Sequence, residues 1–222
     1  MKKQKTPRKL IAFALIPTAI YFFYSAFLTL PITRMFFIHQ LEENGPIELA
    51  SFAMMTLAGI IGLVLAWRVR KKVGRLVFFG LILCGFGFFV IGMEEISWGQ
   101  QFFGWETPEE IAWRNAQGET TLHNHHHLQE FLEILAIMFA LSGLIGVLLQ
   151  RLNVLRDLMP RPILFFWFVP LLVVASLDLM HEFWIFWHEF DELINYLDEV
   201  NEMICAMCAL AFVSFKWREL KT

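Results

Sequence analysis

Carboxylate and imidazole side chains recur in this sequence at the spacing of an α-helix. The segment TTLHNHHHLQE (residues 120–130) places four histidines within five positions. Further along the chain, Asp178, His181 and Glu182 stand at positions i, i+3 and i+4, which lie on one face of a helix. Neutral imidazole nitrogens and carboxylate oxygens are the usual protein ligands of zinc and similar divalent cations. The pattern therefore favours a bound divalent metal such as zinc, although the sequence contains no H-E-x-x-H motif.

Two sets of candidate site residues follow from this pattern. The predicted metal ligands are His123, His126, His127, Glu130, Asp178, His181 and Glu182. The predicted general acids or bases are Glu94, Glu95 and Glu202. Because Glu94 and Glu95 are adjacent, they cannot both face the interior of a bundle, and one of them is expected to bind backbone amides of the following loop. For each candidate, a structural role at a helix end or on a solvated face remains the alternative.

Membrane-spanning helices must position these residues. The 222-residue chain is 57% hydrophobic and 18% charged, whereas a soluble domain usually carries about 25% charged residues. A helix that crosses a bilayer needs about 20 apolar residues. Six runs reach this length, at residues 10–32, 47–67, 76–93, 128–150, 162–180 and 198–215. The sequence predicts an all-α, polytopic membrane helical bundle of six spans that forms a single domain over residues 1–222.

The basic residues predict the orientation of the spans. Sixteen of the 18 lysines and arginines precede span 1, follow span 6, or lie between spans 2 and 3 or spans 4 and 5. The positive-inside rule makes this side cytoplasmic. Both termini are therefore expected in the cytoplasm and the chain in the inner (plasma) membrane, with the loops 33–46, 94–127 and 181–197 facing outward. Nineteen of the 21 acidic residues and all seven histidines lie at or near this outer face, so the candidate site is expected to open outward.

The loop 94–127 carries signals of local folding. Thr107, Pro108 and Glu110 fit a helix start with a capping box and with proline at the first helical position, which predicts a short helix over residues 108–116. Upstream, Phe102, Phe103 and Trp105 are aromatic residues of the kind that lie at membrane interfaces. This extracytoplasmic loop is therefore expected to fold back over the bundle as a cap.

Four strings in this loop carry a family resemblance: EEISWGQ (94–100), ETP (106–108), NAQGE (115–119) and LHN (122–124). They resemble a pattern in uncharacterised bacterial polytopic inner-membrane proteins, which implies a multi-pass membrane protein and no particular activity. A more distant similarity is to the CREST-type membrane hydrolases, such as the alkaline ceramidases, and it implies a metal-dependent enzyme with acids and histidines inside the bundle. The chain departs from that group because it lacks a closing H-x-x-x-H and has six expected spans instead of seven.

Two classes of function remain open on this evidence. The first is a membrane enzyme, a metal-dependent hydrolase or transferase that acts on a lipid or amphiphilic substrate with metal-bound water as the nucleophile and a carboxylate as general acid or base. The second is non-catalytic: a scaffold or assembly subunit, or a transporter or ion or proton pathway. The acids and histidines stop in the outer third of the spans, which favours a pocket over a pathway. Nucleic acid binding is not expected, because the basic residues form short clusters that topology already explains.

Overall fold

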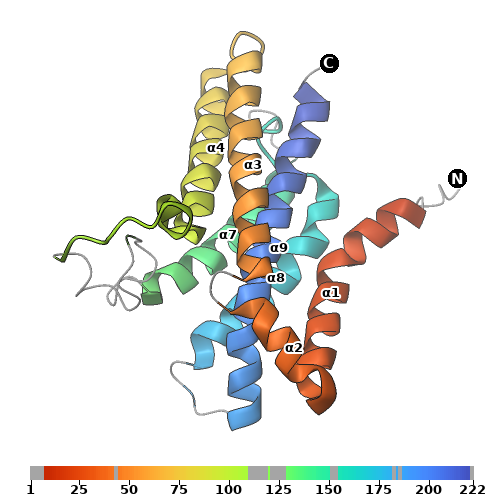
Figure 1. Cartoon of the computed structure of the whole chain (residues 1–222). Helices are drawn as coiled ribbons and strands as arrows, with labels where there is room; N and C mark the ends of the chain where they lie inside the picture. Colours follow the sequence, from red (N-terminus) through yellow and green to blue (C-terminus); the bar gives the residue numbers. More distant parts are fainter. Residues whose placement is uncertain are drawn as a thin grey trace, which may run out of the picture.

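The computed structural model describes residues 8–42, 45–109, 120, 129–150, 155–181, 184 and 187–220, and these residues contain helices and no strand. The helices are α1 (Arg8–Thr29), α2 (Pro31–Leu41), α3 (Pro46–Val69), α4 (Arg75–Glu95), α5 (Gln100–Phe103), α7 (Gln129–Leu149), α8 (Phe165–His181) and α9 (His188–Leu220) (Figure 1). Two short 3₁₀ turns, η1 (Ser97–Gly99) and η2 (Pro162–Leu164), precede α5 and α8. For the described residues the predicted all-α class is confirmed.

The spans predicted from hydropathy correspond to helices. Within the described residues, five helices are long and apolar enough to cross a membrane: α1, α3, α4, η2 with α8 over Pro162–Met180, and α9. The remaining predicted span, 128–150, falls on α7, whose described apolar part is Ile134–Leu149. Large apolar side chains such as Phe22 and Leu83 are each 72% exposed. A broad exposed apolar surface of this kind suits contact with lipid better than contact with water.

Two predicted outer loops are largely helical, and this corrects the sequence analysis. In the expected loop 33–46, residues up to Leu41 belong to α2, which starts with Pro31 in the first turn, a favoured proline position. In the expected loop 181–197, the residues from His188 onward form the first turns of α9, which also extends beyond the predicted span 198–215. These turns are too polar to be recognised by hydropathy. Acids such as Glu189 stabilise them instead, because negative charge is favourable at a helix N-terminus.

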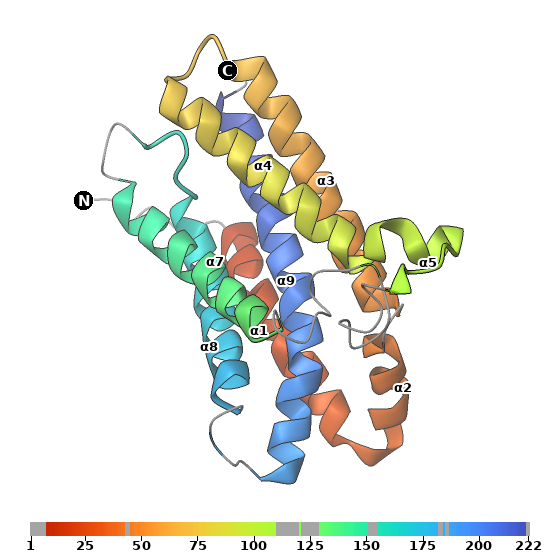
Figure 2. The same ribbon diagram turned by 90° about the vertical axis from the view of Figure 1, so that its left-hand side faces the viewer.

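Helix α9 is the centre of the bundle. It packs against α3 on one side and α8 on another, while α1 contacts both α8 and α9 (Figures 1 and 2). The outer pairs are α3 with α4 and α7 with α8. In α9, the side chains of Val200, Ile204, Ala206 and Ala209 are fully buried. Because α9 touches most of the other long helices, a residue on it can meet side chains from several parts of the sequence.

Glycines bring the backbones of α3 and α4 into contact. A methyl group added at Gly62 would lie 3.0 Å from the Cα atom of Gly85. At Gly59, it would lie 2.5 Å from the backbone nitrogen of Phe89. Small residues allow such close approach where lipid supplies no hydrophobic driving force between helices. The seam fixes the register of α4 against α3, and so fixes the position of Glu95 at the end of α4.

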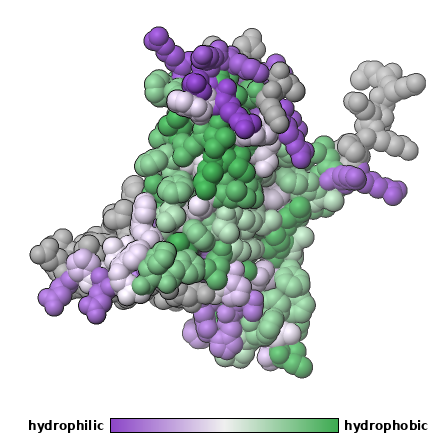
Figure 3. Space-filling model, turned by 45° about the horizontal axis from the view of Figure 1, so that its top comes forward, coloured by the Kyte–Doolittle hydropathy of each residue, from purple (hydrophilic) through white to green (hydrophobic). Residues whose placement is uncertain are grey.

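The lengths of three helices place acids and basic residues at opposite ends of the bundle. Glu48 precedes Arg68 by twenty residues in α3, Glu95 follows Arg75 by twenty in α4, and Asp198 precedes Arg218 by twenty in α9. Twenty residues of α-helix rise about 30 Å, the thickness of the hydrocarbon core of a bilayer. The described N- and C-terminal ends of the chain lie toward the basic end of the bundle, as does the turn between α3 and α4 (Figures 1 and 2). Polar side chains gather at the ends of the molecule, and apolar ones cover the surface between them (Figure 3).

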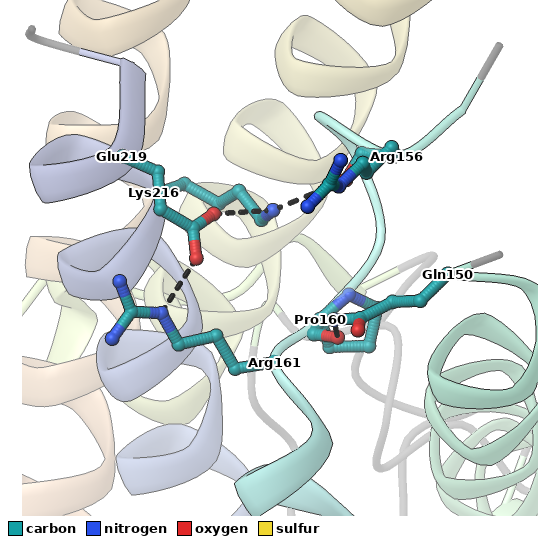
Figure 4. Close-up of polar contacts among 6 residues, drawn as sticks. All are labelled: Gln150, Arg156, Pro160, Arg161, Lys216 and Glu219. Carbon is teal, nitrogen blue, oxygen red and sulfur yellow. Dashed lines mark hydrogen bonds and ion pairs between the residues drawn. The ribbon is translucent and has the colours of Figure 1, made fainter. Parts of the chain in front are cut away.

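A buried ion pair holds the basic end together (Figure 4). The ammonium group of Lys216 is buried and lies 2.6 Å from one carboxylate oxygen of Glu219, and Arg161 donates to the other at 2.5 Å. Lys216 also donates to the backbone carbonyl of Arg156 at 3.5 Å. These contacts join the connection between α7 and α8 to the last turns of α9.

Candidate functional site

Five carboxylates from three helices lie toward the end of the bundle opposite the basic residues, near enough for their charges to act on one another. We call them the acidic site: Glu48 of α3, Glu95 of α4, and Asp198, Glu199 and Glu202 of α9. The charges of Glu48, Asp198 and Glu199 act on Glu95, and the charges of all four act on Glu202, with that of Glu95 the strongest. Glu95 and Glu202, which were predicted as general acids or bases from distant parts of the sequence, are therefore brought together by the fold.

Glu202 is the deepest member of the acidic site. It lies one turn of α9 below Asp198, or about 6 Å further toward the basic end. Its side chain is exposed, although the neighbouring residues Asn201 and Met203 are buried. Part of the surface of Glu202 is thus left uncovered by the packed helices. Arg34 of α2 forms an ion pair with Glu192 of α9. Glu192 precedes Glu199 by two turns, so this ion pair lies nearer the start of α9 than the acidic site does.

A polar stripe on α9 continues the acidic site toward α1. Asp198, Asn201, Glu202 and Cys205 stand at i, i+3, i+4 and i+7 and share one side of the helix. Tyr21 of α1 donates its hydroxyl hydrogen to Oδ1 of Asn201 at 2.5 Å, and this pair is buried. The negative charge of Asp198 also acts on this hydroxyl. One turn beyond Cys205 the stripe reaches the buried Cys208 and Ala209, so its strongly polar part ends about halfway along α9.

The chain leaves α4 through a strained turn beside Glu95. The backbone φ angles of Ser97, Trp98 and Gly99 are 49°, 57° and 93°, all in the left-handed region. That region costs a residue with a side chain roughly 1–2 kcal/mol, so the surrounding contacts must hold the turn. One such contact is the indole nitrogen of Trp98, which donates to Oε1 of Glu94. Glu94 thus accepts a hydrogen bond from the loop, while the charges of the acids on α3 and α9 act on its neighbour Glu95. Strain of this kind clusters at functional sites.

Gln100 fixes the loop that follows this turn. Its side-chain nitrogen donates to the hydroxyl of Thr107 at 2.8 Å, and its side-chain oxygen accepts from the backbone nitrogen of Thr120 at 2.8 Å. The hydroxyls of Thr107 and Thr120 lie 3.1 Å apart. One side chain therefore joins the two described parts of the loop. Beyond Glu109, the short helix predicted over 108–116 lies outside the described residues.

Aromatic rings surround this end of α4. Phe102 of α5 approaches Phe52 of α3, with ring centroids 6.4 Å apart. Phe103 stacks on Trp105 at 5.8 Å with an interplanar angle of 9°. Phe102 and Phe103 are 59% and 79% exposed. Rings exposed at the level of Glu95 suit the interface between hydrocarbon and headgroups, where aromatic residues are enriched.

The predicted metal ligands fall mostly outside the described residues. His123, His126, His127 and Glu182 all lie there. Glu130 lies in the first turn of α7 and His181 ends α8, and for both only the backbone is described. Asp178 is described, and its side chain is 5% exposed within α8. Across the described ranges, no three His, Cys, Asp or Glu side chains are grouped closely enough to hold a metal ion. The metal site therefore stays a prediction.

The structure adds residues that were not among the sequence candidates. Asp198 stands four residues before Glu202, so the helical spacing on α9 was a usable signal for it, and Asn201 lies on the same side. Glu48 was visible as an acid at the start of a span. Tyr21 carried no signal, because a tyrosine within an apolar span is ordinary until its partner is known. The partner was hidden because it lies 180 residues away.

By helix length and hydropathy the chain is a multi-pass, helical membrane protein with a group of carboxylates at one end of its bundle. No family model, curated protein or solved structure matches it. The family resemblance of the loop is accordingly still an expectation, and any function has to be argued from the acidic site.

Proposed function

We propose that this protein is a membrane hydrolase or transferase that acts on a lipid or amphiphilic substrate at its acidic site. The observation that carries the proposal is the approach of Glu95 on α4 to Glu202 on α9, with three further carboxylates around them. Glu202 lies within the span and keeps exposed surface there, which gives a substrate held in the bilayer a place to approach it. The exposed rings of Phe102 and Phe103 supply an apolar entrance at the same end.

Two neighbouring carboxylates can do acid–base chemistry. The charge of each disfavours the ionised form of the other, so one of them can hold a proton while the other is ionised. A pair that shares one proton holds a general acid and a general base in one place. In the proposed reaction, the ionised member of the pair removes a proton from an attacking water or alcohol, and the protonated member gives a proton to the leaving group. The strained turn at Ser97–Gly99 would hold Glu95 in place for this role.

The shape of the polar region favours a site over a conducting path. The stripe on α9 is strongly polar from Asp198 to Cys205 and then becomes apolar toward Val213. A path for ions or protons needs polar groups at several depths of the membrane. If the basic end is cytoplasmic, as the positive-inside rule predicts, the acidic site opens to the outer side of the inner membrane and both termini are cytoplasmic.

The proposal includes a divalent metal such as zinc, bound by residues of α7 and α8. Asp178, its described candidate ligand, is buried in α8. Asp178 follows Arg161 by seventeen residues, which corresponds to roughly 25 Å of helical rise. Glu202 precedes Arg218 by sixteen residues, so the two acids lie at similar distances from the basic end. Carboxylate oxygen is a suitable ligand for such an ion. Elemental analysis of the purified protein tests this part, with about one equivalent of metal expected and its loss expected for Asp178→Asn.

The acid–base role is tested by following lipid turnover. Wild type, Glu95→Gln and Glu202→Gln are reconstituted into vesicles of total bacterial lipid extract, and the lipids are compared by mass spectrometry over time. Removing a general acid or base usually costs about 10²–10⁴-fold in rate. We therefore expect a lipid product that forms with wild type and slows by at least about a hundredfold in each variant. Glu189→Gln is the matched control, because Glu189 is an exposed acid on the same helix, outside the acidic site.

Two outcomes would overturn the proposal. If wild type and Glu202→Gln leave the same lipid profile, the protein does not act on those lipids. If instead Glu202→Gln changes only proton or cation flux into the vesicles, the acidic site belongs to a transporter. Recovery of a fixed protein partner that Glu202→Gln releases, without any lipid product, would identify a scaffold.

A further inference from the structure

A hollow opens between α3 and α9 near the basic end, far from the acidic site. It is lined by Ile61 of α3 and by Ser214, Trp217 and Arg218 of α9. Its volume is about 310 Å³, which is at the lower end of the range for small-molecule sites, about 300–1,000 Å³. Helices α3 and α9 lie side by side along their length (Figures 1 and 2). The hollow is therefore a gap in the side chains of an otherwise packed seam.

The hollow lies where α3 and α9 change from basic to apolar residues. Arg68 and Arg218 mark the basic ends of α3 and α9, and the guanidinium of Arg68 lies 4.9 Å from the ring centroid of Trp217. Ser214 lies one turn below Arg218, and Ile61 lies two turns below Arg68, about 10 Å deeper by helical rise. The rim is thus charged, and the floor is apolar.

The rim offers hydrogen-bond donors and positive charge without a competing carboxylate. Arg68 and Arg218 are exposed, and neither forms an ion pair with the residues that the structure describes. Glu219, the nearby acid, is already held by Lys216 and Arg161 (Figure 4). Guanidinium groups match the oxygens of a phosphate and bind them in pairs.

The hydroxyl of Ser214 is also unused. Ser51, Ser142 and Ser176 each donate to a backbone carbonyl of their own helix, as serines within helices commonly do. Ser214 makes no such bond within the described structure, although it lies inside α9. A hydroxyl that lines the hollow beside Arg218 adds a further donor for an anionic oxygen.

The floor continues as an apolar track along α3. Leu57, Ile61 and Val64 share a side of the helix, and Leu57 and Val64 are 47% and 41% exposed. A ligand that places a phosphate at the rim can therefore lay an acyl chain along this track. An inorganic anion would use the rim alone.

We propose that the hollow between α3 and α9 binds the phosphate of an anionic phospholipid in the leaflet at the basic end of the bundle. The guanidinium groups of Arg68 and Arg218 and the hydroxyl of Ser214 hold the phosphate oxygens, and one acyl chain packs over Ile61. Basic pockets between spans are known to serve lipid headgroups in this way. The proposal is independent of the chemistry at the acidic site.

Native mass spectrometry of the purified protein, titrated with phosphatidylglycerol or with phosphatidylcholine, tests this binding. A hydrogen bond from a guanidinium to the bound phosphate contributes about 1 kcal/mol net, whereas a charge that does not contact the lipid is screened by solvent. We therefore expect phosphatidylglycerol affinity to fall about fivefold in Arg68→Gln or Arg218→Gln, and about thirtyfold in the double variant. Ser214→Ala should weaken binding by a smaller factor. Arg70→Gln is the matched control, because it removes the same charge from the same end and its side chain lies over Trp67 instead.

The outcomes separate the possible ligands. Selective loss of phosphatidylglycerol in the double variant, with Arg70→Gln like wild type and unchanged unfolding temperatures, supports the proposal. Equal binding by the double variant and Arg70→Gln overturns it, and so does equal affinity for phosphatidylcholine. If inorganic phosphate displaces the lipid from wild type at comparable concentration, the hollow is a site for a free anion and the lipid assignment is wrong.

Discussion

Tyr21 of α1 and Asn201 of α9 form a buried hydrogen bond across 180 positions of sequence. The bond fixes the face of α9 that carries Asp198 and Glu202, because Asn201 is next to Glu202 and one turn from Asp198. A second hydrogen bond joins α1 to α8. The indole nitrogen of Trp167 on α8 donates to the backbone carbonyl of Phe13 on α1 at 2.9 Å. Helix α1 is thus held to the bundle by polar bonds as well as by packing.

Removing the hydroxyl of Tyr21 should destabilise the bundle. In Tyr21→Phe, the side-chain oxygen of Asn201 loses its donor inside the packed helices, and an unsatisfied buried group costs about 1–3 kcal/mol. We expect a lower unfolding temperature in detergent. Tyr24→Phe is the control, because Tyr24 lies one turn away on α1, its ring packs on Phe37, and its hydroxyl bonds to no described residue. Equal unfolding temperatures for the two variants would contradict a stabilising role for the bond.

The seam between α3 and α4 should reject a methyl group at one glycine and accept it at another. In Gly59→Ala the new carbon would lie 2.5 Å from the backbone nitrogen of Phe89, so the helices must separate. Overpacking of this kind costs about 1–3 kcal/mol. In Gly87→Ala the new carbon has open space within 4 Å, and alanine favours helix. Thermal unfolding should therefore show a loss for the first variant and none for the second, and the reverse order would show that the seam is looser than described.

Gln100 should control the order of the loop beside the acidic site. In Gln100→Ala, Thr107 and the backbone nitrogen of Thr120 both lose their partner. Hydrogen exchange of the amides over residues 104–109 should then become faster, by at least about fivefold if one bond of about 1 kcal/mol is lost. Glu106→Ala is the control, since Glu106 is exposed in the same segment. Unchanged exchange in Gln100→Ala would mean that other contacts hold this loop.

The sequence predicts the spans well because lipid demands long apolar runs, and such runs stand out in hydropathy. It fails at α2, an eleven-residue helix that is too short to be recognised as a span, and at the start of α9, where the helix continues with polar side chains. There, capping and helix propensity decide the structure, and hydropathy carries no information. The glycines of α3 and α4 fit the small-residue pattern of packed membrane helices. The sequence does not tell which of them meets a neighbouring backbone, because Gly59 and Gly87 differ only once the helices are placed.

The acidic site was predictable in part. Glu95 and Glu202 were predicted because each is an acid near the outer end of an apolar span. Their proximity depends on α4 and α9 both packing against α3, and a sequence of six spans allows many such arrangements. Tyr21 and Asn201 show the same limit, since a bond over 180 positions depends wholly on helix order.

Removing Glu219 should destabilise the protein more than removing its ion-pair partner Lys216. In Glu219→Gln the buried ammonium of Lys216 keeps its charge without a carboxylate, which costs about 3–5 kcal/mol in a fully buried pair and less here, because Glu219 is 29% exposed. In Lys216→Met the stem is replaced by an apolar chain, and Glu219 keeps Arg161 as its partner at 2.5 Å. We therefore expect Glu219→Gln to lower the unfolding temperature more than Lys216→Met does. Asp157→Asn, an exposed acid at the same end, controls for the change in net charge. A larger loss in Lys216→Met would show that Lys216 acts through its bond to the carbonyl of Arg156 and not through the ion pair.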